Sequence, residues 1–331
     1  MREFKVGKNE DGMRIDKLVD RILPQADKGF KFKMFRKKNI VLNGKKVEGS
    51  ERVTAGDEVK FFLSDETYDK FAGAALEAKE QVRDMAEAGA EKAKAFDFAS
   101  HIIYEDEDVI LVNKPEGILT QKAVPSDVSL NEYLIEYLLE EGRITQAELA
   151  TFKPSVCNRL DRNTSGIVCC GVSMKGLREL SRMFRDRTVH KYYLTIVKGV
   201  MREGAHQKAY LIKDEKTNKV TLLKTQKEGA EAIETAWRPI KSEGGNTLLE
   251  VRLYTGKSHQ IRAHLAANGY PVAGDNKYGD IMYNRALRDD YKVKSQVLTA
   301  YRIVFPECPE LPKISGREFR ISEPKGFFIH L

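Results

Sequence analysis

The chain has 331 residues, a net charge of +7 and a pI of about 9.0, and 41% of its residues are hydrophobic and 32% charged. This length exceeds what one small core requires, so we expect two folded units of ordinary globular composition. No apolar run reaches the roughly 20 residues that span a bilayer, and the first residues lack the apolar stretch of a secretion signal. These features argue against a membrane protein.

The cysteines argue against a zinc ribbon, because none of the four forms a C-x-x-C pair. Cys169 and Cys170 are adjacent in the apolar run GIVCCGV. We expect them to be buried thiols of a reducing compartment, so the sequence predicts a cytoplasmic protein.

Two helices are predicted near the N-terminus. From residue 13 to 22 the apolar residues have the spacing of an amphipathic helix, which Pro24 ends. A basic helix is expected over residues 30–38, within a stretch (28–38) that has six cations and no acid. Phe30, Phe32 and Phe35 interleave these cations, so one side can anchor in a core while the other presents charge to phosphate. A solvated surface is the alternative reading of such a charge run.

A small sheet is predicted next. Asn43-Gly44 in IVLNGKKV marks a tight hairpin, and a turn at residues 55–57 leads into the strand VKFFL. MRIDKLVDRILP, the basic helix, VLNGKKV and AGDEVKFF together resemble the S4 RNA-binding domain over residues 12–63. In S4 domains the second helix and its flanking loop dock on structured RNA. The resemblance therefore implies these RNA-binding residues: Lys31, Lys33, Arg36, Lys37 and Lys38.

The composition changes over residues 64–100. ALEAKEQVRDMAEAGAEKAKAF is rich in Ala, Glu and Lys and lacks a broad apolar stripe. This favours an exposed helix or a linker without a catalytic role. A second unit is expected to begin near His101, where IIYEDEDVILVNKPEGILT has a strand–turn–strand pattern.

The first motif with chemical potential is NRLDRNTSGIVCCGV, residues 158–172, a polar loop followed by an apolar run that predicts a buried strand. Asp161 lies between Arg159 and Arg162, which favour its ionised form. An ionised Asp at the mouth of a strand suits a nucleophile or a charge stabiliser. A structural loop aspartate is the alternative.

The second motif is HKYYLTIVKG, residues 190–199, a strand by its β-branched and aromatic content. Tyr192 and Tyr193 are expected on opposite faces. A strand tyrosine usually packs in a core, but an aromatic ring beside a catalytic loop can stack on a base.

The third motif is LEVRLYTGKSHQIRAHLAANGYPVAGDNKYG, residues 249–279. A strand is expected to end at Tyr254, and Ser258 is expected to cap a short helix that Asn268-Gly269 ends. The first turn, whose backbone N–H groups can hold an anion, then contains His259, Gln260 and Arg262. His259 and His264 have poor spacing for a shared metal, so no metal site is predicted.

In chain order, RLDRNTSG, KYYLTIVKG and TGKSHQIRAHLAANGYPVAGDNKYG resemble the RluA-type pseudouridine synthase family. The resemblance spans about residues 101–305 and includes NKPEGI and the closing GD..YG segment. It implies an α+β chain: an S4-like domain (1–63), a charged helical linker (64–100) and a catalytic domain (101–331) on a mixed, largely antiparallel sheet with a cleft across its face. An S4 domain before such a domain is the arrangement of the family's large-subunit ribosomal RNA enzymes.

The resemblance also implies roles residue by residue. Asp161 is the essential carboxylate, Arg159 is associated with flipping the target base, and Arg262 pairs with Asp161. Tyr193, ahead of Tyr192, stacks on the uracil and is a candidate for the later proton abstraction. Further substrate contacts are expected from Arg162, Thr164, Lys191, Lys257, His259 and Gln260.

Two positions depart from the family pattern. Asn158 stands where His is frequent before RLD, and Lys257 stands where Arg is usual after TG. Neither change removes a catalytic atom. The guanidinium of arginine can bind a phosphate through two nitrogens, whereas the ammonium of lysine is a point charge, which puts a bidentate phosphate contact at Lys257 in doubt.

The implied reaction needs no cofactor: uracil leaves C1′, rotates and bonds again through C5, after which the C5 proton departs. Asp161 can attack C1′ or remove the C2′ proton, and the sequence leaves both open. Because neither atom is reachable in a stacked helix, the target must be flipped, at a cost of a few kcal/mol. The expected partner is RNA, with large-subunit ribosomal RNA favoured, and a monomer is the default state.

Other functions stay open. A non-catalytic RNA-binding or ribosome-assembly factor fits the S4-like unit and the charge, but not the combination of Asp161, Tyr193 and Arg262. A synthase acting on transfer RNA is a second possibility. A glycosidase would need a second, acidic carboxylate, which the three motifs do not clearly supply.

Overall fold

The structure is a computed structural model that describes residues 1–72, 96–214, 217 and 219–322. The chain divides into two compact units. Unit 1 comprises Met1–Ser100, Asn131–Ser155 and Ser173–Lys175, and unit 2 comprises His101–Leu130, Val156–Val172 and Gly176–Leu331. Unit 1 thus includes two segments that the sequence placed in the second domain.

Unit 1 contains the two helices and the small sheet expected near the N-terminus. The helices are α1 (Ile15–Ile22) and α2 (Lys28–Arg36). The antiparallel sheet has the order β1 (Arg2–Lys5), β4 (Glu58–Phe61), β2 (Ile40–Leu42), β3 (Lys45–Lys46). Asn43 and Gly44 both have positive φ, 49° and 73°, as the predicted two-residue hairpin requires.

The core of unit 1 explains why these elements form. The apolar residues of α1, at the predicted helical spacing, are buried together with Phe35 of α2 and Phe61 of β4. Asp27 caps α2 by accepting a hydrogen bond from the Phe30 N–H at 2.8 Å. Phe30 and Phe32 pack against this core, as the interleaved aromatic pattern predicted.

The rest of unit 1 comes from later in the chain. Residues 65–72 are helical and pack on its core through Tyr68 and Phe71, whereas most of the predicted 64–100 linker lies outside the described residues. The unit also contains α4 (Leu130–Glu140) and the short η3 (Glu148–Ala150). Thr151, which follows η3, donates a hydrogen bond to the buried Glu10 at 2.7 Å.

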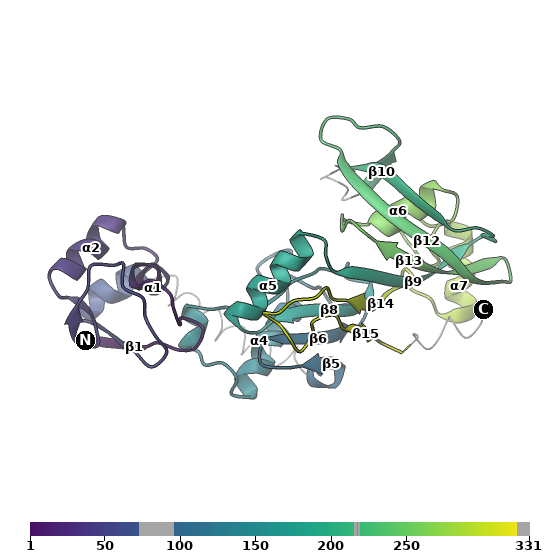
Figure 1. The fold of residues 1–331 in the computed structure, drawn as a ribbon. Helices are drawn as coiled ribbons and strands as arrows, with labels where there is room; N and C mark the ends of the chain where they lie inside the picture. Colours follow the sequence, from purple (N-terminus) through teal and green to yellow (C-terminus); the bar gives the residue numbers. More distant parts are fainter. Residues whose placement is uncertain (73–95, 215–216, 218, 323–331) are drawn as a thin grey trace. The chain divides into compact units, whose positions relative to one another are not determined.

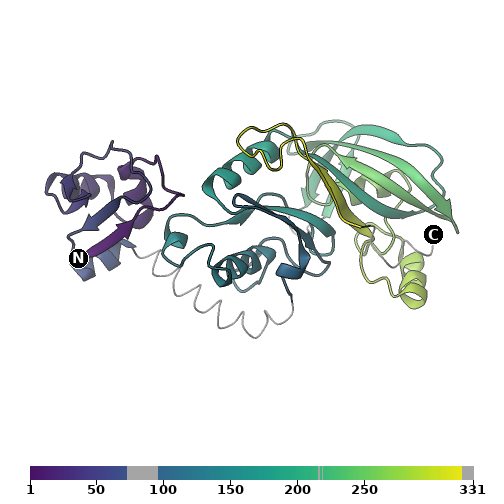
Figure 2. The same cartoon turned by 60° about the horizontal axis from the view of Figure 1, so that its bottom comes forward.

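Unit 2 is built on an 11-stranded sheet, shown in Figures 1 and 2. Its strands are β5 (Ile102–Glu105), β6 (Val109–Lys114), β7 (Ser155–Val156), β8 (Ser165–Gly171), β9 (His190–Lys198), β10 (Ala205–Asp214), β11 (Lys219–Leu223), β12 (Glu231–Glu243), β13 (Asn246–Leu253), β14 (Leu298–Val304) and β15 (Glu318–Arg320). The main order is β11-β10-β12-β13-β9-β14-β8-β6-β5. Named neighbours in that order are antiparallel except β14 and β8, so the predicted mixed, largely antiparallel sheet is confirmed.

Three helices accompany this sheet: α5 (Met174–Arg185), α6 (Gln260–Ala267) and α7 (Ile281–Tyr291). Leu180 and Met183 of α5 pack in one core cluster with residues of β6 and β8. Ala263 of α6 packs with residues of β10, β11 and β12. Cys169 and Cys170 are buried thiols within β8, as predicted, and burial raises the pKa of both.

β14 joins the two halves of the sheet at a narrow parallel contact with β8. Ser165 pairs with Thr299, and Gly166 pairs with Ala300. Gly166 has φ +115°, and a Cβ there would lie 2.2 Å from the Ala300 carbonyl oxygen. Only glycine fits this position, because the backbones of the two strands touch. None of the described helices is long and apolar enough to cross a membrane.

Candidate active site

Unit 2 contains a pocket of about 760 Å³, within the range of roughly 300–1,000 Å³ that is typical of ligand sites. It is formed by residues 119–123 and 159–164, Tyr193 of β9, the end of β13, the turn before α6, and residues near 276 and 296. Among the described residues that line it, Asp161 is the single carboxylate. The lining cations are Lys122, Arg159, Arg162, Lys213, Lys257, Arg262 and Lys277. The pocket therefore favours an anionic ligand.

Asp161 lies in the loop that precedes β8, with its side chain 31% exposed. Its Oδ2 accepts a hydrogen bond from Nη1 of Arg262 at 3.0 Å. Its backbone oxygen accepts from the Thr164 N–H at 3.0 Å, which turns the chain toward the strand. The structure thus joins the acid of the first motif to the guanidinium of the third, the pairing that the resemblance implies.

Arg262 is held in turn by Asp275, which is 1% exposed. Nε and Nη2 of Arg262 donate to the two oxygens of Asp275 at 2.7 and 2.8 Å, a bidentate pair. Burial by itself would raise the pKa of Asp275, but the hydrogen bonds and charge of Arg262, together with two backbone N–H groups, lower it overall. Both partners are therefore charged, and the fork fixes the third guanidinium nitrogen toward Asp161.

Lys114, at the end of β6, anchors the Asp161 loop through hydrogen bonds to backbone carbonyl oxygens. Its buried Nζ donates to the carbonyl oxygens of Pro115, Ile118 and Arg162 at 2.8, 2.9 and 3.1 Å. Burial lowers its pKa to about 8, although the charges of Asp161 and Glu116 act in the opposite direction. This lysine ties the loop to residues 115–118, next to the acid.

The two tyrosines of β9 have different surroundings. Tyr193 lines the pocket and is 6% exposed, and burial, followed by the charge of Asp161, raises its pKa. Tyr192 lies outside the residues that line the pocket, with the guanidinium carbon of Arg302 3.5 Å from its ring centroid. Tyr193 is therefore the one placed to meet a ligand.

His259 occupies the N-cap position of α6 with φ +53°, in the left-handed region. This conformation costs a residue other than glycine about 1–2 kcal/mol. Ser258 was predicted to cap this helix, and that prediction is wrong: the described contacts at the helix start come instead from Gln260, whose Oε1 accepts from the Lys257 N–H at 3.1 Å. The turn directs His259 toward Asp161, with Nε2 4.0 Å from Oδ2.

Comparison with known proteins identifies the family to which the chain belongs. The family model described as RNA pseudouridylate synthase matches residues 108–267. The chain is 31% identical over 308 residues to an uncharacterized RNA pseudouridine synthase of Mycoplasma genitalium, covering 92% of this chain and 89% of that protein. It is 31% identical over 268 residues to ribosomal large subunit pseudouridine synthase C of Rickettsia bellii, covering 81% and 83%. The chain belongs to the RluA-type family of RNA pseudouridine synthases.

This membership makes the protein an isomerase that acts on RNA, rather than the non-catalytic RNA-binding factor considered from the sequence. Its fold is shared with human RNA Pseudouridylate Synthase Domain Containing 4. The two structures have a TM-score of 0.55 and 20% identity, over 76% of this chain and 95% of the human one.

The predicted substrate contacts of the synthase differ in how they relate to the pocket, and Lys191 alone among them lies outside its lining. Gln260 is 2% exposed, and its amide is engaged by Thr255, the Lys257 N–H, Thr235 and the Glu234 carbonyl. Gln260 lines the pocket, and these hydrogen bonds make its amide a brace of the turn before α6. Lys191 is outside the residues that line the pocket, and burial lowers its pKa.

The remaining predicted contacts line the pocket as Gln260 does. Arg159 and Arg162 are exposed beside Asp161, and Thr164 is buried, accepting from Gln296 at 3.3 Å. Lys257 also lines the pocket, but its Nζ is paired with Glu231. Asn158, the departure from the family pattern, braces β8: it donates to the Ile167 carbonyl and accepts from the Cys169 N–H.

The predicted RNA-binding residues of unit 1 are also not equivalent. Lys33, Arg36, Lys37 and Lys38 are exposed. Lys31 is 7% exposed, and its Nζ binds Asp20 of α1 at 2.7 Å. Lys31 lies on the core side of α2, so its charge ties the two helices together.

Sequence reasoning missed Asp275, Lys114, Tyr278 and Lys277 as members or supports of this site. All four lie within motifs that were recognised, NKPEGI and GDNKYG, but no role was assigned to them. A signal existed for Asp275, since a buried arginine requires an acidic partner.

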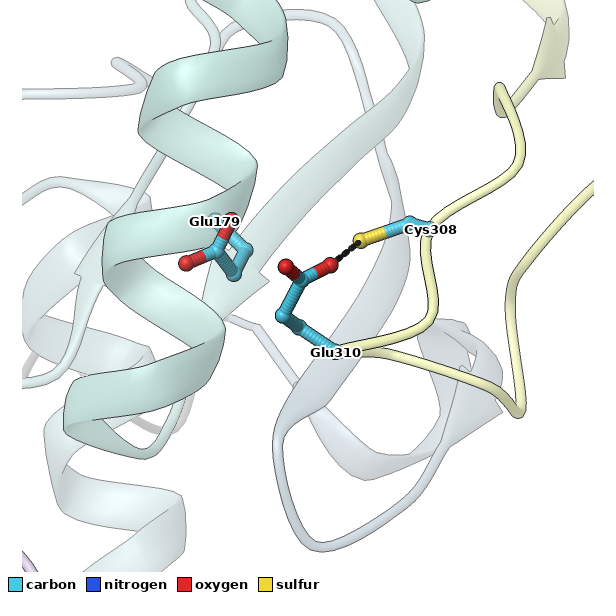
Figure 3. A group of neighbouring side chains, drawn as sticks. All are labelled: Glu179, Cys308 and Glu310. Atoms are coloured by element: carbon cyan, nitrogen blue, oxygen red, sulfur yellow. Dashed lines mark hydrogen bonds between the residues drawn. The ribbon is translucent and has the colours of Figure 1, made fainter.

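A second group of polar side chains lies outside the pocket lining. Glu179 of α5 lies near Cys308 and Glu310, which follow β14, with ligand atoms within 4.8 Å of one another (Figure 3). Cys308 Sγ donates to Glu310 at 3.4 Å, while Arg178 and Arg182 both bind Glu179 at 2.8 Å. Because these two cations already neutralise Glu179, we assign no metal to the group.

Proposed function

We propose that this synthase converts uridine to pseudouridine in large-subunit ribosomal RNA, with Asp161 as the catalytic carboxylate. The observation that carries this assignment is the placement of Asp161: it is the single carboxylate among the described residues lining a cationic pocket, and Arg262 holds it at 3.0 Å. A glycosidase with paired carboxylates would need a second acid there.

The proposed reaction takes place within one nucleotide, so it needs no cofactor. The bond from C1′ to N1 breaks, the uracil turns, a bond from C1′ to C5 forms, and the C5 proton leaves. Asp161 either attacks C1′ or removes the C2′ proton, and both routes need the carboxylate that Arg262 and Asp275 hold in place. Arg159 is exposed at the mouth, where it can replace the flipped base.

Tyr193 is the proposed partner of the flipped uracil. Its ring lines the pocket, where stacking on a base is worth about 1–3 kcal/mol. Its raised pKa keeps the hydroxyl protonated at neutral pH. To accept the C5 proton, the hydroxyl must therefore pass its own proton to a neighbouring base, and Asp161 is the carboxylate whose charge acts on it.

We expect Tyr193→Phe to separate stacking from proton transfer. Phenylalanine keeps the ring but removes the oxygen, so RNA affinity should change less than about threefold while turnover falls by about 10²-fold or more. The measurement is single-turnover kinetics alongside RNA binding, with Tyr192→Phe as the matched control. Wild-type turnover in Tyr193→Phe would remove the hydroxyl from the mechanism.

Two arguments favour ribosomal RNA as the target. A relative that aligns with 81% of this chain at 31% identity is named a ribosomal large subunit pseudouridine synthase. In addition, the two helices and four-stranded sheet of unit 1 fit the proposed S4-like domain, with exposed cations on α2. Phosphate contacts by this domain would offset the cost of flipping the base.

The test is tritium release from RNA labelled at C5 of uridine, because isomerisation exchanges that hydrogen. Large-subunit ribosomal RNA should release tritium, whereas transfer RNA should release little. Release from transfer RNA alone would correct the substrate, and the appearance of free uracil would indicate hydrolysis. Mapping pseudouridines in total RNA from a strain without the gene would then identify the target.

The exposed cations of α2 and of the two residues after it lead to a prediction about the salt dependence of RNA binding. Neutralising Lys33, Arg36, Lys37 and Lys38 should weaken RNA binding and flatten its dependence on salt, because each lost phosphate contact lowers the slope of log K against log salt by about 0.7–0.9. Binding is measured from low to moderate salt.

Lys31→Gln is the matched control, since it removes one charge from the buried side of the same helix. It should lower stability without changing the slope. If the variant with all four substitutions has an unchanged slope, α2 is not part of the RNA interface.

A further inference from the structure

His259, Tyr278 and Val220 form a chain of polar contacts beside the pocket. The Val220 N–H of β11 donates to the Tyr278 hydroxyl at 2.9 Å. The same hydroxyl lies 2.9 Å from Nδ1 of His259. The rings of His259 and Tyr278 meet edge to face, with centroids 5.6 Å apart. The orientation of the imidazole is thus fixed by a partner from outside its own helix.

These contacts determine which nitrogen of His259 carries the proton. A backbone N–H can only donate, so the Tyr278 oxygen accepts from Val220. Its own proton then has one acceptor among the contacts of the described residues, Nδ1 of His259. If Nδ1 carried a proton instead, the half-buried hydroxyl would lose that acceptor. The neutral imidazole therefore has its proton on Nε2.

The Nε2–H is directed into the pocket. It lies 4.0 Å from Asp161 Oδ2, which is too long for a hydrogen bond, and the side chain is 10% exposed. Within the described part of the chain, no acceptor lies within hydrogen-bonding distance of Nε2. A donor is thus held beside the carboxylate by a backbone conformation with φ +53°, which is uncommon for residues other than glycine, and its proton is available to a ligand.

We propose that the Nε2–H of His259 donates a hydrogen bond to a carbonyl oxygen of the target uracil, and that Tyr278 keeps this donor in place. When the bond from C1′ to N1 breaks, its electron pair stays with the uracil, and the negative charge spreads to the carbonyl oxygens of the base. A fixed donor stabilises that charge without transferring its proton. This inference rests on the proposed function and adds a residue that stabilises the leaving group.

The groups around His259 favour its neutral form. Burial lowers its pKa, and Arg262 and Lys277 act in the same direction, whereas Asp161 and Asp275 oppose them; the pKa is lowered overall. The imidazole is therefore neutral at pH 7, and Tyr278 has to select its tautomer. An imidazolium would carry a proton on both nitrogens and would need no such selection.

The first test compares His259→Phe with His259→Gln. Phenylalanine lacks the donor, so we expect kcat to fall by about 10²-fold, the effect of removing one fixed donor, with KM changed by less than about threefold. Glutamine keeps an N–H and should recover part of kcat. Unfolding by urea checks that both variants are folded.

The second test is the pH profile of Tyr278→Phe. Without the hydroxyl, neutral His259 can place its proton on Nδ1, so kcat should fall at pH 8. As pH falls through the lowered pKa of His259, both nitrogens become protonated and the donor is restored, so the ratio of variant to wild-type kcat should rise as pH falls from 8 through that pKa. Tyr283→Phe, which removes a hydroxyl bound to Asn246 outside the pocket lining, is the matched control and should show a flat ratio.

If His259→Phe keeps the wild-type kcat, the proposal that His259 donates to the uracil is wrong. If the kcat ratio of Tyr278→Phe does not change with pH, the proposal that Tyr278 selects the tautomer of His259 is wrong. Either result leaves the proposed function intact as long as Asp161→Asn is inactive. Tritium release by Asp161→Asn would instead overturn the proposed function itself.

Discussion

Replacing Asp161 with Asn should abolish pseudouridine formation, lowering single-turnover rates by at least about 10³-fold while RNA still binds. The amide has nearly the same shape as the acid but can neither attack C1′ nor remove the C2′ proton. Arg262 stays fully paired with Asp275, so the fold should persist. Tritium release and RNA binding are measured on the same preparation.

The control for this variant is Asp280→Asn, which changes a partly exposed acid that binds Lys198 at 2.6 Å outside the pocket lining. It should retain full activity. Activity of Asp161→Asn above one hundredth of wild type would contradict the assignment of the carboxylate. If Asp161→Asn no longer binds RNA, Asp161 contributes to RNA binding and not only to the chemical step.

Arg262→Met should be the most destabilising change in the site. It leaves the carboxylate of Asp275, which is 0% exposed, without its bidentate partner. Removing one member of a buried ion pair costs about 3–5 kcal/mol in the free energy of unfolding. The variant should also be inactive, because Asp161 loses the same guanidinium. Urea unfolding at pH 7 and tritium release give the two measurements.

The loss of stability in Arg262→Met should depend on pH. In the wild type the pKa of Asp275 is lowered, so the pair stabilises the fold above the usual pKa of 3.8 and loses this effect as pH falls through the lower value. Without Arg262, burial raises that pKa. The difference in stability between wild type and Arg262→Met should therefore grow between pH 4.5 and pH 7. A stability difference that stays constant over this pH range would contradict the prediction.

The double variant Arg262→Met with Asp275→Asn separates stability from catalysis. The uncharged amide no longer needs the guanidinium, and its oxygen can still accept from the N–H groups of Lys277 and Tyr278. Stability should therefore recover in large part, while activity stays absent. Renewed activity would show that Arg262 is needed for folding alone.

Much of the fold could be predicted because local signals and burial agree. The spacing of apolar residues in α1, Asn43-Gly44 in its hairpin and the apolar run of β8 each gave the element that the structure contains. The predicted cap of α6 was wrong. Serine is generally preferred at the N-cap position, which favoured Ser258, but His259 occupies this position with a left-handed backbone and Gln260 binds the turn. Tertiary contacts override local propensity at such places.

The site could be predicted only in part, because motif positions say which residues come together and not which of them are buried. Gln260 and Arg262 share one helix turn, yet the first is used by protein partners while the second reaches Asp161. Lys31 and Lys33 are neighbours in one charged run, but one of them faces the core. Burial depends on the whole sheet and is not readable from charge alone.

The position of β14 bears on when the enzyme becomes competent during synthesis. This strand, residues 298–304, lies between β8 and β9, which carry the Asp161 loop and Tyr193. β9 (ending at residue 198) and β8 (ending at residue 171) are both made long before β14 begins at residue 298, and until β14 arrives each presents an unpaired edge to the nascent chain and its surroundings. Assembly of the catalytic groups is therefore a late, long-range event, the kind of pairing that slows folding and gives chaperones time to act.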